Sequence, residues 1–76
     1  MTPTQTRAAH PSSSTVATLE AMAQLAGQTA SVIHVVVPRE PGVVDNARRL
    51  AGRAGVELCV DLLPRTVRLR FDGQFS

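Results

Sequence analysis

The sequence contains no lysine, no tryptophan and no tyrosine, and it has a single cysteine. One cysteine, Cys59, excludes an intrachain disulfide and a cysteine-based metal cluster. No apolar run approaches the roughly 20 residues that a membrane helix needs, and the N-terminus lacks the basic-then-apolar order of a secretory signal. We therefore expect no metal, no cofactor, no membrane contact and a location in the cytoplasm of a bacterium.

Large side chains are also scarce. The hydrophobic fraction of 43% is ordinary for a globular protein, but it consists largely of Ala and Val, with two Phe. At 76 residues the chain is one small domain, near the length at which a single core only just stabilises a fold. A core of small side chains buries little area per residue, so we expect the chain to hide further surface in a homodimer or against a partner protein.

All eight basic residues are arginine, a bias that a genome rich in G and C produces without any functional meaning. The formal net charge is only +2, and the excess lies in residues 39–54, where four arginines face Glu40 and Asp45. Charges in the rest of the chain balance, and there is no long basic run. Nucleic-acid binding is therefore permitted by the composition but not required by it.

The N-terminal third predicts a tail and a helix. Residues 1–13 contain two prolines and no apolar periodicity, which is typical of a flexible tail, and His10 within it is expected to be solvated. Ser14 is a plausible N-cap, and Gly27 is expected to end the helix. Its apolar stripe recurs at steps of three and four residues: Val16, Leu19, Met22 or Ala23, and Ala26.

A strand and a second helix are predicted next. Residues 31–37 (SVIHVVV) are apolar on both faces except at His34, a pattern typical of a central strand covered on both sides. The segment PREPG breaks this strand, and helical spacing runs from about Pro41 to Ala54, with Gly55 as a left-handed cap. The buried stripe is expected to comprise Val43, Ala47, Leu50 and Ala54, with Val44 and Ala51 alongside.

The C-terminal part predicts a hairpin. Residues 56–62 and 66–72 alternate between apolar and polar side chains, and Pro64 lies in the turn between them. One face is apolar, with Val56, Leu58, Val60, Leu62, Val67, Leu69 and Phe71. The other carries Glu57, Cys59, Asp61, Arg68 and Arg70, whose charges are expected to pair across the strands. Residues 73–76 are expected to fray.

The predicted domain, residues 14–72, is therefore an α+β two-layer open sandwich in the order α-β-α-β-β. Both helices are expected to cover the apolar face of a three-stranded sheet. The opposite face carries charges on the hairpin but Val32, His34 and Val36 on the first strand. An uncovered apolar strip is typical of a partner surface, so these three residues are the predicted interface.

One segment resembles a known family. A strand followed by PREPGVV, then a helix ending in AGVEL and a hairpin, is similar to the first half of the ACT domain over about residues 32–71. In amino-acid-sensing members, ligands bind at the Pro-Gly turn beside a dimer interface. The resemblance thus implies ligand contacts from Pro41, Gly42 and Val43. Arg39 replaces the usual acidic residue, which would favour an acidic ligand, and the family's second helix and fourth strand do not follow.

No paired carboxylates, phosphate loop or nucleophile elbow occurs in the sequence, so we expect no catalytic residues and no enzymatic activity. The first hypothesis is a small regulatory or protein-interaction module that dimerises through its sheet. The second is a nucleic-acid binder, although aromatic residues for base stacking are missing. Its phosphate contacts would come from six arginines: Arg48, Arg49, Arg53, Arg65, Arg68 and Arg70. The third is an ACT-like sensor of an amino acid or small metabolite.

Overall fold

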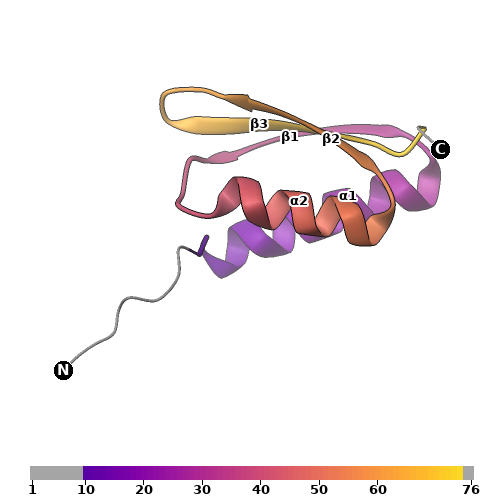
Figure 1. Cartoon of the computed structure of the whole chain (residues 1–76), viewed down its shortest axis with the longest axis horizontal. Coiled ribbons are helices and arrows are strands. Elements are labelled where there is room, and N and C mark those ends of the chain that lie inside the picture. Colours follow the sequence, from indigo (N-terminus) through magenta and orange to yellow (C-terminus); the bar gives the residue numbers. More distant parts are fainter. Residues whose placement is uncertain (1–9, 75–76) are drawn as a thin grey trace.

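The computed structural model describes residues 10–74, which form two layers, with helices on one side and a sheet on the other (Figure 1). Residues 1–9 of the expected tail and residues 75–76 of the expected frayed end lie outside this part. The elements are α1 (Ser13–Thr29), β1 (Val32–Pro38), α2 (Val43–Ala54), β2 (Glu57–Leu62) and β3 (Thr66–Asp72). The predicted α+β class, the element order and the position of both helices on one face of the sheet are confirmed.

The last strand, β3, occupies the centre of the sheet. The strand order is β1-β3-β2, and β3 pairs antiparallel with both neighbours. Its alternation explains the position, because Val67, Leu69 and Phe71 are fully buried against the helices while Arg68 faces solvent. The β1-α2-β2 segment therefore crosses over a strand that is added last.

The expectation that the first strand is central was wrong. β1 is an edge strand, and its second face is uncovered: His34 is exposed and Val36 is 57% exposed. An apolar run on both faces predicts burial on both faces only when other parts of the same chain supply the second layer. Here both helices pack on the other side of the sheet, so half of the apolar surface of β1 is left open.

Helix α1 is longer at both ends than the sequence predicted. Ser12, not Ser14, is the N-cap, and its hydroxyl accepts a hydrogen bond from the Thr15 amide. The helix passes Gly27 and ends at Thr29, and its C-cap Ala30 adopts the left-handed conformation with φ 51°. Gly27 instead lies where the helices approach closely, because a Cβ there would lie 2.9 Å from the Ala54 carbonyl oxygen. The residues buried along α1 are Thr15, Leu19, Ala23 and Ala26.

Helix α2 begins at Val43 rather than at Pro41. Gly42 is its N-cap and has φ 80°, a left-handed conformation that cannot belong to the helix. Gly55 ends the helix with φ 72°, as predicted. The sequence prediction missed Asn46, which is only 6% exposed and whose Oδ1 has no hydrogen-bond partner among residues 10–74. The buried residues of α2 are Val43, Asn46, Ala47, Leu50 and Ala51.

The hydrophobic core is built largely from small side chains, as expected. Four of its members are alanines, and the largest fully buried side chain is Phe71. Leu62 was predicted to point inward, but it is 53% exposed at the end of β2, where it lines a shallow cavity together with Val43 of α2. The core comprises Leu19, Ala23, Ala26, Val37, Val43, Ala47, Leu50, Ala51, Val67, Leu69 and Phe71.

Candidate interface on the open face of the sheet

The face of the sheet opposite the helices has an uncharged side and a charged side. The register places His34 of β1 beside Arg70 of β3, and Arg70 in turn beside Cys59 of β2. One row along, Val36 neighbours Arg68. The apolar strip of Val32, His34 and Val36, which we call the β1 strip, thus borders a row of arginines on the central strand.

Both arginines of the central strand bond to β2, away from the β1 strip. Arg68 Nη2 lies 2.8 Å from Asp61 Oδ2, the one salt bridge among residues 10–74. Arg70 Nη2 donates to Cys59 Sγ at 3.2 Å. This hydrogen bond, together with Coulombic attraction, raises the pKa of Arg70 above its ordinary value. The predicted pairing across the hairpin is confirmed for Arg68, and the β1 strip contains no carboxylate or guanidinium group.

The hydrogen bonds that flank the sheet show which backbone groups of β1 are free. Ser31 O accepts from Gly73 N at 2.8 Å, and Arg39 N donates to Arg65 O at 3.0 Å. In an antiparallel pair every second residue exchanges its hydrogen bonds with the partner, so the odd-numbered residues of β1 face β3. The N–H groups of Val32, His34 and Val36 therefore point outward from the sheet edge, together with their carbonyls.

The free edge of β2 is different. Leu63 N donates to Thr66 O at 2.9 Å, so the odd-numbered residues of β2 face β3. Leu58, Val60 and Leu62 direct their backbone groups outward, while Glu57 and Asp61 place carboxylates on the open face beside them. Charged side chains along an edge strand oppose pairing with another strand. Of the two free edges of the sheet, only that of β1 has no carboxylate or guanidinium side chains beside its free backbone groups.

The Pro-Gly turn holds a shallow cavity of about 230 Å³, lined in part by Arg39, Gly42 and Val43. The structure thus brings three of the four residues of the predicted ligand site together, while Pro41 does not line the cavity. The guanidinium of Arg39 is engaged, because its Nη1 donates to the Leu63 carbonyl at 3.0 Å.

Glu40 is a structurally important residue of this turn that the sequence prediction overlooked. Its Oε1 accepts from the Ser12 amide at 2.6 Å, and its Oε2 accepts from the Thr15 hydroxyl at 3.2 Å. The carboxylate thus caps the first turn of α1 from the loop before α2, where the helix dipole favours negative charge. No local pattern signals this contact, since 28 residues separate the partners.

The six predicted nucleic-acid-binding arginines are not brought together on one surface. Arg48, Arg49 and Arg53 are exposed on α2, in the helical layer. Arg68 and Arg70 lie on the opposite, open face of the sheet, and Arg65 lies in the turn before β3. A phosphate backbone that followed one of these groups would not reach the other on the same face.

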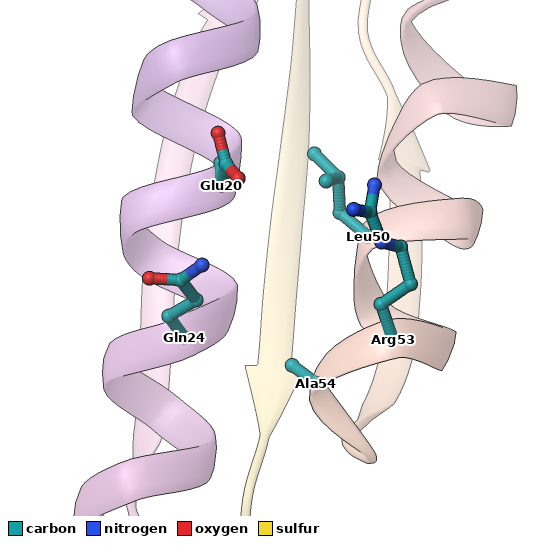
Figure 2. Close-up of a pocket in the computed structure, with 5 residues that line it drawn as sticks. All are labelled: Glu20, Gln24, Leu50, Arg53 and Ala54. Atoms are coloured by element: carbon teal, nitrogen blue, oxygen red, sulfur yellow. The ribbon is translucent and has the colours of Figure 1, made fainter.

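A groove of about 200 Å³ runs between the helices (Figure 2). Glu20 and Gln24 reach it from α1, and Leu50, Arg53 and Ala54 line it from α2. Among these side chains no hydrogen bond or ion pair is formed. Catalysis requires polar groups that converge and are held rigidly, and this groove offers one carboxylate and one guanidinium without mutual contact.

Within residues 10–74 no group of three or more His, Cys, Asp or Glu side chains is placed to hold a metal ion. Neither helix of this part of the chain is long and apolar enough to cross a membrane. His10 bonds to the adjacent Pro11 carbonyl, and His34 is exposed on the β1 strip.

No family model, curated protein or solved structure matches the chain. The resemblance of residues 32–71 to the ACT domain therefore stays a prediction. The assignment of a function depends on the geometry of the fold itself.

Proposed function

We propose that this chain is a small non-catalytic interaction module that dimerises through its sheet, with a regulatory role. The observation that carries the proposal is the β1 strip, where Val36 is 57% exposed beside an exposed His34 and a half-buried Val32. An apolar strip that no helix covers is stabilised when another surface excludes water from it.

The distribution of charge supports the same surface. The open face carries its carboxylates and guanidinium groups on β2 and β3, where Arg68 and Arg70 are bonded to β2 side chains. A partner that approaches over β1 therefore meets uncharged side chains and need not desolvate a guanidinium or a carboxylate. The centres of protein interfaces are depleted in charge in the same way.

The test is the substitution Val36→Glu, read as the dimer dissociation constant by analytical ultracentrifugation. A carboxylate in the contact would raise that constant on the order of 100-fold, because association would have to remove water from the added charge. The monomer should keep its fold, since Val36 is exposed and Arg68 lies opposite it. Circular dichroism checks this point.

Cys59→Glu is the matched control, because it adds the same charge to the same face, next to Arg70 on β2. We expect it to leave the dissociation constant within about twofold. A chain that stays monomeric at high micromolar concentration, with or without either substitution, would refute dimerisation.

A further inference from the structure

We infer that the partner is a second copy of this chain, added edge to edge through antiparallel pairing of β1 with β1 about Val35, so that two three-stranded sheets become one. The inference deepens the proposed function and rests on it. An alternative dimer, in which the two open faces stack on each other, would use the β1 strip without joining the sheets.

The free backbone groups of β1 fit this pairing. With Val35 opposite Val35 of the second copy, His34 lies opposite Val36, and Val32 lies opposite Pro38. The outward N–H groups of Val32, His34 and Val36 then all meet carbonyls of the second copy. Pro38 has no N–H to lose, and its position at the strand end is one where proline is tolerated.

The side chains also match about this axis. On the helix-facing side Ile33 lies opposite Val37 of the second copy, so apolar side chains meet along the whole strand. On the open face the β1 strip meets its own copy, and no ionisable group of β1 other than His34 takes part. A register centred on His34 would instead oppose two imidazoles and leave Val37 facing Ser31.

Helix α1 extends the same uncharged surface below the sheet edge. Within the sheet α1 packs more against β1 than against β3, and Glu20 and Gln24 on one of its flanks line the groove with α2. At about 100° per residue, Met22 and Leu25 lie on the opposite flank, beside the free edge of β1. Leu25 is 42% exposed, one of the three large hydrophobic side chains that are exposed in the described part.

A twofold axis perpendicular to the sheet at Val35 brings the two α1 helices side by side and antiparallel beneath the joined strands. Met22 and Leu25 of each copy then face the same flank of the other, together with Thr18 and Thr29, and none of these side chains is charged. The β2 edge does not offer such an uncharged contact, because self-pairing there brings Glu57 and Asp61 of two copies together. Charge and shape thus favour a second copy at β1.

Substitution on the helix flank separates the two dimer forms. Leu25→Glu should weaken association at least tenfold in the edge-to-edge dimer, because the carboxylate would lose water against the uncharged flank of the other copy. Ala17→Glu adds the same charge to an exposed position of α1 that faces away from the sheet, and it should have no effect. Equal dissociation constants for both variants and the unaltered chain would overturn the inference.

A cysteine substitution tests the register. In a Cys59→Ser background, Val35→Cys should form a disulfide-linked dimer on mild oxidation, because the two side chains would lie directly opposite each other. Ile33→Cys should not, since its counterpart lies four residues away along the joined strands. Faster cross-linking of His34→Cys than of Val35→Cys would overturn the Val35-centred pairing.

The closing experiment uses the unaltered chain and measures amide hydrogen exchange by NMR at concentrations below and above the dimer dissociation constant. The amides of Val32, His34 and Val36 should exchange at least tenfold more slowly in the dimer. The outward amides of Leu58, Val60 and Leu62 on the β2 edge are the control and should not change.

The outcomes of this experiment distinguish the two proposals. Dimerisation without new protection on β1 would overturn edge-to-edge pairing and leave an interaction module with stacked faces. Slower amide exchange at the β2 edge, without slower exchange on β1, would show that the sheets join through β2 and would overturn the inference. A monomer at every concentration would refute the inference and the proposed dimer together.

Discussion

The two edges of the sheet are made in different ways. β1 is uncharged and bare on its outer side, yet both of its ends are fastened by long-range contacts, from Gly73 to Ser31 and from Arg39 to Arg65. β2 is protected by carboxylates and is joined to β3 by a short turn, but Leu62 at its end is exposed. The comparison explains why we propose β1 and not β2 as the edge that pairs, because only β2 carries carboxylates that oppose the addition of a further strand.

The largest effect on stability is expected from a substitution that disrupts the contact between Gly73 and Ser31 at the start of β1. A Cβ on Gly73 would lie 1.9 Å from the Ala26 carbonyl oxygen, so Gly73→Ala must displace either α1 or the end of β3. We expect a loss of about 3 kcal/mol in the free energy of unfolding, at the upper end for an overpacked site. Urea denaturation measures the change.

Gly52→Ala is the matched control for that substitution. A Cβ at Gly52 would meet nothing within 4 Å, and the residue lies within α2. Alanine should stabilise the helix by about 0.5–1 kcal/mol. Equal effects of the two substitutions would mean that Gly73 does not fasten the β1 side.

A smaller loss should follow from removing the cap that joins the β1–α2 loop to α1. Glu40→Gln keeps the shape of the side chain but removes the negative charge of the carboxylate. That carboxylate accepts hydrogen bonds from the Ser12 amide and the Thr15 hydroxyl. We expect about 1–2 kcal/mol of destabilisation, typical of a lost helix cap. Thermal unfolding followed by circular dichroism gives the value. Glu20→Gln, at an exposed position, should change little, and a similar loss there would point to net charge as the cause.

The smallest effect is expected at the β2 edge. Asp61→Asn removes the salt bridge to Arg68, whose partners are both well exposed. Exposed pairs contribute little, so the free energy of unfolding should fall by less than about 0.5 kcal/mol. Asp61→Asn is more informative about association, because β2 then keeps only one of its two carboxylates, that of Glu57. New concentration-dependent amide protection at Val60 in Asp61→Asn would show that charge alone keeps this edge unpaired.

The local sequence pattern predicted the helices and strands. It did not predict the order of the strands in the sheet, which depends on pairing between distant segments. Alternation in residues 66–72 and the left-handed cap at Gly55 indicated β3 and the end of α2 correctly. The central place of β3 did not follow, because the apolar run of β1 is equally compatible with a buried strand and with an edge that awaits a partner.

The candidate surface was predictable in composition but not in its geometry. Alternation identified Val32, His34 and Val36 as one face, and the structure leaves that face without a helix. Which backbone groups point outward depends on the register with β3, which no local pattern encodes. Gly27 is a second case in which a long-range contact was not predictable. It was expected to end α1, but it lies within the helix and allows α1 and α2 to approach closely.

The central position of β3 has a consequence for synthesis. β1 and β2 make no hydrogen bonds to each other, so neither can join this sheet until β3 has been synthesised. During that interval β1 has two free edges instead of one, and its uncharged VIHVVVP segment is open to neighbouring nascent chains. The step that completes the fold is therefore also the step that protects the chain from premature association.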